Sequence, residues 1–312
     1  MKFEPISGRE LPRFSGIKTF FRLPHVAIDA GYDLGIVGVP FDGSLSYRPG
    51  ARFAPTRIRE LSALGRVYHW ERRLNFVEHL KVADLGDCPT VPIDVMKTYG
   101  AIENYFSKLL TLNKKFISVG GDHSTTLPIL RALYKKHKKP LAFIHFDAHL
   151  DTYPAAWGCE YHHGSFLRHA IEEGLVRGDL TFQLGLRGPL AGQEDLDFVK
   201  KHKLNSWTVE DLRTSPLESF TKKINKQIGK VPTYLSFDID CLDPAYAPGT
   251  GTPVVGGLTT YETQCLLRRL AVPLVGADVV EVSPPYDPSD ITSLAAVDTL
   301  FELINIFALS QK

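Results

Sequence analysis

The segment FDAHLD, residues 146–151, constrains this chain more than any other stretch. It follows a short apolar run, residues 141–144, that is typical of a buried strand. In an extended chain residues at alternate positions point the same way, so Asp147, His149 and Asp151 are expected to converge on one spot. Two carboxylates crowded around an imidazole repel each other unless a positive charge lies between them. A divalent cation supplies that charge.

Two further stretches have the same design. Residues 233–237 are expected to form a strand that ends in an aspartate pair, and the apolar run 116–119 leads through two glycines to a histidine. Together the three strand ends supply six candidate metal ligands: His123, Asp147, His149, Asp151, Asp238 and Asp240. Four carboxylates and two imidazoles are too many for one tetrahedral zinc site. They suit two divalent cations that share bridging carboxylates.

Each motif alone is also compatible with a helix cap, a turn or a buried core histidine. Their joint position, at the ends of separate apolar strands, favours a ligand site, because open α/β sheets bind ligands at that edge. Strand and helix patterns alternate along all 312 residues, without a repeat or linker. This predicts the α/β class: a three-layer α/β/α domain over 1–312, with a central, mostly parallel sheet of about eight strands. Residues 1–30 are expected to form an arm lying over it.

The charge balance and the termini exclude several classes of function. A net charge of +1 argues against a nucleic-acid or membrane-surface partner, because those roles use a marked basic excess. The four cysteines form no CxxC pair and are expected to be reduced thiols. No secretory signal is visible, and no apolar stretch of membrane-spanning length is expected. These features predict a cytoplasmic location.

Several long motifs resemble those of the ureohydrolases, the arginase and agmatinase family. They are GGDHS (120–124), FDAHLD, SFDIDCLDP (236–244) with APGTGTP (247–253), and EVSPPYD (281–287), and the similarity extends from residues 11–24 through SYRPGARFAP (46–55). The resemblance implies an arginase-like fold, two manganese ions (Mn2+) per chain and a homo-oligomer, a trimer or hexamer. Nickel (Ni2+) or cobalt (Co2+) could use the same ligands.

The resemblance also implies roles for residues outside the ligand set. Glu281, at the end of the last predicted strand, is expected to bind a guanidinium, and the apolar residues before it disfavour exposure. His163 in the HG motif is the expected proton shuttle, with neighbouring His162 as the fallback. Thr252 is expected to lie near the reacting group. Among supporting residues we expect Asp243 beside Asp240, and Asp122 and Ser124 beside His123.

The resemblance also implies that the substrate is a small guanidino compound. Residues 152–162 lack the asparagine and the Ser-Gly-Asn-like stretch with which arginases recognise an amino acid, which counts against arginine. The resemblance favours agmatine, split into putrescine and urea. Guanidinobutyrate or another guanidino acid would need a cation such as Arg48 near the pocket, whereas Glu160 would suit an amine. A single-metal amide hydrolase and a catalytically silent family member remain as alternatives.

Overall fold

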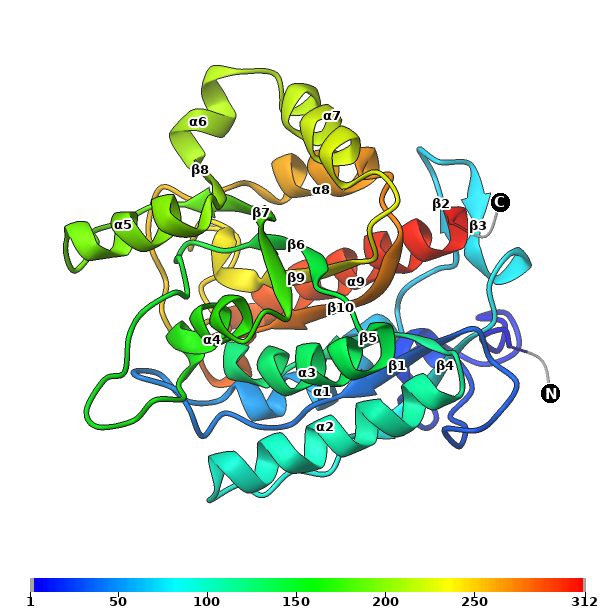
Figure 1. Cartoon of the computed structure of the whole chain (residues 1–312). Coiled ribbons are helices and arrows are strands. Elements are labelled where there is room, and N and C mark those ends of the chain that lie inside the picture. Colours follow the sequence, from blue (N-terminus) through cyan, green and yellow to red (C-terminus); the bar gives the residue numbers. More distant parts are fainter. Residues whose placement is uncertain (1–2, 311–312) are drawn as a thin grey trace.

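Eight strands form one central sheet in which every neighbouring pair is parallel. The computed structural model describes residues 3–310, and its strands run through the middle of the molecule (Figure 1). The order is β4 (Val82–Asp87), β1 (Leu34–Gly38), β5 (Lys115–Val119), β10 (Leu274–Val280), β9 (Thr233–Asp238), β6 (Leu141–Phe146), β7 (Val176–Leu186) and β8 (Asn205–Thr208). The predicted sheet of about eight strands is confirmed, and it is parallel throughout.

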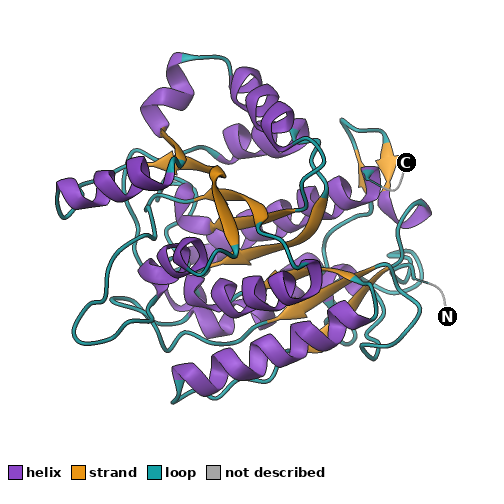
Figure 2. Cartoon of the chain, viewed as in Figure 1, coloured by secondary structure: helices purple, strands orange, loops and turns teal. Residues whose placement is uncertain are grey.

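Helices cover both faces of this sheet (Figure 2), which confirms the three layers. One face carries α2 (Val95–Thr111), α3 (Thr126–His137), α4 (Phe166–Glu172) and α5 (Gln193–His202). The other carries α1 (Ala54–Ser62), α6 (Val209–Thr214), α7 (Leu217–Ile228), α8 (Thr260–Arg269) and α9 (Ile291–Leu309). Two apolar cores result, one on each side. We call them the α3 side and the α9 side of the sheet.

Strand residues alternate between these two cores, as the period of an extended chain requires. In β6, Ile144 and Phe146 pack on the α9 side and Phe143 packs on the α3 side. In β9, Leu235 packs on the α9 side and Tyr234 on the α3 side. A parallel sheet buried on both faces explains why these strands are nearly continuous apolar runs in the sequence.

Short 3₁₀ turns connect many elements, and three of them carry predicted site residues. Turn η4 follows β5, η5 precedes α4 and η6 follows β9. Within residues 3–310 the turns are η1 (Phe20–Arg22), η2 (Ala51–Phe53), η3 (Phe76–Glu78), η4 (His123–Thr125), η5 (His163–Ser165), η6 (Ile239–Cys241), η7 (Pro284–Tyr286) and η8 (Pro288–Asp290). The tight turns hold the polar side chains directly above the strand ends.

Helix α9 corrects one expectation. The segment Pro288–Leu309 is long and apolar enough to cross a membrane, so the prediction that no stretch approaches this length is wrong. However, 72% of its most apolar window is buried inside the molecule, where α9 packs against α1, α8 and β10. A helix that is mostly enclosed by other elements is apolar on most of its faces, and the packing therefore explains the composition.

A small hairpin that the sequence did not predict packs against the same helix. Strands β2 (Tyr68–His69) and β3 (Leu74–Asn75) form it, and the His69 Nε2 atom lies 3.0 Å from the carboxylate of Glu302 in α9. Arg268 Nε donates to the same carboxylate at 2.6 Å. These contacts satisfy a glutamate that is fully buried in an otherwise apolar helix.

The N-terminal arm covers an edge of the sheet. Phe20, Phe21 and Leu23 are buried, and the chain then runs beside β4, where Val26 N donates to Asp84 O at 3.0 Å. The arm thereby pairs with the outer edge of β4, whose backbone groups would otherwise be open to another chain. Residues 1 and 2 of the predicted arm lie outside the described range.

Candidate metal centre and active site

The turns after β5, β6 and β9 bring all six predicted ligands to one place at the carboxyl edge of the sheet. The reason differs in part from the predicted alternation. Strand β6 ends at Phe146, and Asp151 has a φ of +50°, so the segment after β6 is a turn and not extended chain. Likewise Asp240 lies in η6, and Asp238 caps that turn by accepting from Asp240 N at 2.8 Å. The carboxylates converge through turn geometry.

His123 forms the centre of a first cluster. Its Nδ1 atom lies 3.2 Å from Asp147 Oδ2, 3.1 Å from Asp151 Oδ2 and 3.0 Å from Asp238 Oδ2. Both His123 and Asp147 are fully buried. Three carboxylate oxygens from two different turns therefore surround one imidazole nitrogen.

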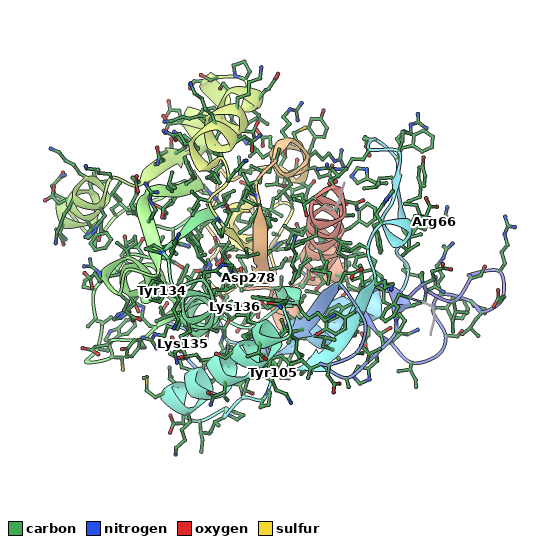
Figure 3. All side chains as sticks on the ribbon, turned by 45° about the vertical axis from the view of Figure 1, so that its right-hand side comes forward. Arg66, Tyr105, Tyr134, Lys135, Lys136 and Asp278 are labelled. Carbon is green, nitrogen blue, oxygen red and sulfur yellow. The ribbon has the colours of Figure 1, made fainter. Side chains whose placement is uncertain are left out.

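The orientation of the His123 ring is set from below. Its Nε2 lies 2.8 Å from Ser236 Oγ, and Ser236 donates to Asp278 Oδ1 at 2.6 Å. Because a carboxylate only accepts, the hydroxyl hydrogen points to Asp278 and Ser236 Oγ accepts from Nε2–H. Figure 3 labels Asp278 in the interior of the molecule. In the neutral ring, Nδ1 then presents its lone pair to the carboxylates.

A second cluster lies beside the first. His149 Nδ1 is 3.1 Å from Asp240 Oδ2 and 3.4 Å from Asp147 Oδ1. Asp147 thus uses one oxygen in each cluster, which is the arrangement of a carboxylate that bridges two ions. The ligand atoms of Asp147, His149 and Asp240 all lie within 4.8 Å of one another.

The electrostatics of the two clusters fit two divalent cations. Burial, with the negative charges of Asp240 and Asp147, raises the pKa of Asp238 well above its usual range. Burial would also raise the pKa of Asp147, but the imidazoles of His145, His123 and His149 hold this pKa well below its usual range. His123 Nδ1 has no hydrogen-bond partner although it is buried. A buried imidazole nitrogen without a partner is available to bind a metal ion. The four crowded carboxylates carry a charge of about −4, which two divalent cations would neutralise.

Sequence reasoning missed His145, which lies on β6 directly before the central motif. It is fully buried, and its Nε2 is 2.8 Å from Asp147 Oδ2, close enough to count as a further metal ligand. Gln183 decides against that role. Its Nε2 donates to Leu150 O at 2.9 Å and lies 3.1 Å from His145 Nδ1. An amide nitrogen only donates, so Nδ1 accepts and the ring proton is on Nε2, facing Asp147.

Glu281 occupies a strained position at the end of β10. Its φ is +64°, a conformation that a residue other than glycine rarely adopts, and its side chain is buried. Its Oε1 accepts from His123 N at 2.9 Å, whereas its Oε2 has no partner. A Cβ added to Gly251 would lie 3.3 Å from that Oε2, so glycine leaves the free oxygen open on this side.

Of the two adjacent histidines, His163 lies in the site. Its Nδ1 is 3.3 Å from Glu281 Oε1, whereas His162 Nε2 lies 3.0 Å from Pro154 O. Burial opposes the charging of His163, but the Glu281 carboxylate outweighs it and raises the pKa of His163 to about 9. Burial lowers the pKa of His162. Thr252 Oγ1 donates to Asp240 Oδ2 at 3.3 Å, which places it beside the second cluster.

Known proteins share both the sequence and the fold of this chain. A model of the arginase family matches residues 32–305. The chain belongs to the arginase family. It is 42% identical to the guanidinopropionase of Pseudomonas aeruginosa over 307 residues (98% of this chain, 96% of the relative) and 40% identical to the agmatinase of Cronobacter sakazakii (93% and 92%). Among solved structures, proclavaminate amidino hydrolase of Streptomyces clavuligerus superposes with a TM-score of 0.91 at 41% identity, covering 95% of this chain and 99% of that one.

This ureohydrolase therefore carries the predicted set of motifs, but its supporting residues differ from those expected. Asp243 accepts from the backbone of Ala245, Gly256 and Gly257, and so orders a loop and not Asp240. Asp122 accepts from Ser124 Oγ and from the backbone of the loop after β1, and neither residue contacts the His123 ring. Ser236 and Asp278 take that supporting role.

Arg187, which follows β7, is a second support that the sequence did not reveal. Its guanidinium donates to five backbone carbonyls, among them Asp240 O at 2.7 Å and Val254 O at 2.7 Å. It thereby ties the turn that carries Asp240 to the loop that follows. An arginine satisfied by carbonyls brings a positive charge close to the ligands without pairing with any of them.

A pocket of about 410 Å³ opens above the clusters in this ureohydrolase. Its walls are Ser46, His149, Asp151, Tyr153, Pro154, Ala155, Ala156, Trp157, His162, His163, Gly164, Ala191, Glu194, Asp195 and Thr252. Arg48 and Glu160, which the sequence suggested as determinants of substrate specificity, do not line this pocket. Arg48 lies 5.2 Å from the rings of Tyr47 and Tyr286, and Glu160 is exposed.

Proposed function

We propose that this ureohydrolase hydrolyses agmatine to putrescine and urea, using two manganese ions. The observation that supports a guanidino substrate is the free, buried Oε2 of Glu281 beneath the pocket. A buried carboxylate oxygen without a partner is unfavourable, and a guanidinium satisfies it with charge-assisted hydrogen bonds. With four carboxylates matched to the cations, Glu281 is left to balance the charge of the substrate.

The residues then have distinct tasks in the reaction. Two divalent cations, when bound, lower the pKa of a water molecule to about 7 and so supply a nucleophile at neutral pH. His123, Asp147, Asp151, Asp238, His149 and Asp240 would hold them. Glu281 orients the guanidinium, and Thr252 is close enough to contact the group under attack. His163, protonated at neutral pH, gives its proton to the leaving amine, which is otherwise a poor leaving group.

The charge of the pocket walls favours a substrate with a second amine. Among the lining residues within 3–310, Glu194 and Asp195 are the acidic residues besides the metal ligand Asp151, and no lysine or arginine is present. His162, the remaining basic group toward the rim, has a lowered pKa and is neutral at neutral pH. An ammonium is therefore better accommodated than a carboxylate at the far end of the substrate.

A second candidate is a guanidino acid. The 42% identity with a guanidinopropionase favours it, since it is slightly higher than the 40% identity with the agmatinase. In this case His162 would have to become protonated, or a cation would have to move into the pocket. The two candidates share the metal centre and differ only at the rim.

Manganese follows from the ligand set, in which oxygen atoms outnumber nitrogen atoms four to two, and nickel or cobalt remains compatible with it. We also propose a homo-oligomer, trimeric or hexameric, and a cytoplasmic location. Light scattering of the purified protein tests the first. Fractionation of the source cells tests the second.

The decisive experiment is a urea-release screen with agmatine, guanidinobutyrate, guanidinopropionate, arginine and guanidine. We expect kcat/KM for agmatine to exceed that for every acid by at least roughly tenfold. A preference for an acid would replace agmatine by the second candidate. No urea from any compound, with about two manganese ions bound per chain, would overturn the proposal.

Variants separate metal binding from proton transfer. Asp238→Asn and His149→Ala are expected to abolish urea release and to lower the manganese content. His163→Ala is expected to slow turnover by roughly 10²–10³-fold with manganese retained. If His163→Ala has no effect, the proton comes from His162 or from solvent.

A matched pair tests the rim. Glu194→Gln is expected to raise KM for agmatine several-fold with kcat nearly unchanged, because it removes a charge far from the reacting carbon. Asp197→Asn removes a carboxylate from the same helix outside the pocket and is the control. An equal effect of both changes would indicate that the overall negative charge of this helix attracts the substrate, and not a contact between Glu194 and the ammonium group.

A further inference from the structure

Ser46 contacts the proposed shuttle on the side away from Glu281. Its Oγ lies 2.7 Å from His163 Nε2, and its backbone N lies 3.3 Å from the same atom. Ser46 is exposed and lines the pocket, whereas His163 is buried. The two nitrogens of His163 therefore face different partners, with Nδ1 toward Glu281 and Nε2 toward Ser46.

The loop that carries Ser46 is fixed to the site at a second point. Ser44 O accepts from His163 N at 3.1 Å, and Ser44 N donates to Asp122 Oδ2 at 2.9 Å. Asp122 is fully buried and in turn accepts from Ser124. These hydrogen bonds fix Ser44, two residues before Ser46, and so hold the start of the loop that carries Ser46 against His163.

The two groups that Ser46 offers are not equivalent. A backbone N–H only donates, so it stabilises His163 only while Nε2 is unprotonated. A hydroxyl donates to the neutral ring and accepts from the protonated ring. In the protonated ring both N–H groups need acceptors, which Glu281 Oε1 supplies on one side and Ser46 Oγ on the other.

We propose that Ser46 is a positioning residue for proton transfer: its hydroxyl accepts from His163 Nε2–H and holds the Nδ1–H toward Glu281 and the leaving amine. This inference rests on the shuttle role proposed for His163. It adds a residue that neither touches the reacting carbon nor binds metal. Its effect should appear in the protonation of His163 and in kcat.

Every charged group around His163 bears on that protonation. Glu281 after β10, Asp151 after β6 and Asp122 after β5 all favour the charged ring, whereas burial opposes it. Neighbouring His162 is neutral at neutral pH. None of these charged groups contacts Nε2. Among the described residues, Ser46 therefore provides the contact that differs between the protonated and the unprotonated Nε2.

Ser46→Ala tests the proposal. The protonated ring loses its acceptor while the backbone N–H of residue 46 remains, so the pKa of His163 is expected to fall by roughly one to two units. Because the protonated form donates, activity declines as pH rises through this pKa, and the decline should begin at lower pH in the variant. At pH 8 kcat should fall by roughly two- to tenfold, in step with the protonated fraction of His163, with KM and manganese content unchanged.

Two further variants make the result specific. Ser46→Thr keeps the hydroxyl and should restore the pH profile. Ser44→Ala, which removes a buried hydroxyl without a hydrogen-bond partner, should leave the profile of the wild type. The kinetic arm uses whichever guanidino compound the protein hydrolyses fastest.

Nuclear magnetic resonance of protein labelled at histidine gives a readout that needs no substrate. A fall in the pKa of His163 in Ser46→Ala but not in Ser44→Ala would support the proposal. An unchanged pKa would overturn it, even if the protein hydrolyses agmatine. Failure of every guanidino substrate would instead overturn the proposed function and leave this titration to decide the role of Ser46.

Discussion

The two sides of the central sheet have equal burial and opposite chemistry. On the α9 side, the last inward residues of β6, β9 and β10 are Phe146, Phe237 and Val279. The residue one position earlier in each strand faces the α3 side, and these residues are His145, Ser236 and Asp278. All six are at most 1% exposed. One side remains apolar up to the strand ends, whereas the other becomes polar one residue below the metal ligands.

This difference separates stability from function within single strands. A polar side chain in a dry interior lowers stability unless its hydrogen bonds are satisfied. The α3 side satisfies them within the protein, since Asp278 accepts from Thr126 Oγ1 at 2.7 Å and Tyr234 OH at 2.8 Å as well as from Ser236. The polar side thus orients ligands, and the apolar side supplies the hydrophobic stabilisation that this orientation requires.

The largest expected effect comes from the apolar side. Leu235→Ala, one residue from Ser236 but facing α9, should lower the free energy of unfolding by about 2–5 kcal/mol, because it leaves a cavity among fully buried side chains. Manganese affinity of the folded protein should remain as in the wild type. Urea unfolding of the metal-free protein and a chelator competition measure the two quantities. A loss of affinity in this variant would contradict the separation of the two sides.

The polar side should show the reverse pattern. Ser236→Ala removes the acceptor of His123 Nε2–H and frees the ring to rotate or change tautomer, so manganese affinity should fall by roughly 10–100-fold. The free energy of unfolding of the metal-free protein should change by only about 1 kcal/mol.

Ser118→Ala is the control for this change. It removes a buried hydroxyl from the neighbouring strand β5 that contacts Ala277 O at 3.5 Å. Manganese affinity should not change there. If both variants lost the same manganese affinity, the buried polar residues on this side would affect metal binding through the stability of the fold and not by orienting His123.

Much of the fold follows from local pattern. Parallel strands buried on both faces give short apolar runs, and Thr259 and Glu262 form a capping box at the start of α8, a spacing that is recognisable in the sequence. Two features of the fold were not predicted from the sequence. The β2–β3 hairpin has only two residues in each strand, and α9 is apolar because of what surrounds it, which no window of its own sequence reveals.

The site divides in the same way. The six ligands were predictable because they lie at or just after the carboxyl ends of strands, where a change from apolar to charged residues is conspicuous. Ser236, Asp278 and Gln183 were not, because they lie inside strands and meet His123 or His145 only through neighbouring positions in the sheet. A buried aspartate or glutamine within an apolar run was the available signal, and it indicates a satisfied interior polar group.

The smallest expected effect comes from a residue on the α3 side that contacts His145 and no metal ligand. Gln183→Leu removes the donor to His145 Nδ1, so the ring can adopt either tautomer and no longer presents a fixed N–H to Asp147. Manganese affinity should fall by roughly fivefold, about 1 kcal/mol. The comparison is with Ser206→Ala, since Ser206 Oγ donates to Gln183 Oε1 at 2.7 Å and contacts neither the histidine nor a ligand. If the effect declines from Ser236 through Gln183 to Ser206, the contribution of a hydrogen bond to ligand orientation falls as the number of bonds between it and a ligand rises. If Gln183→Leu binds manganese as the wild type does, His145 is held by packing between Phe143 and Phe166 and the polar side ends at Asp278.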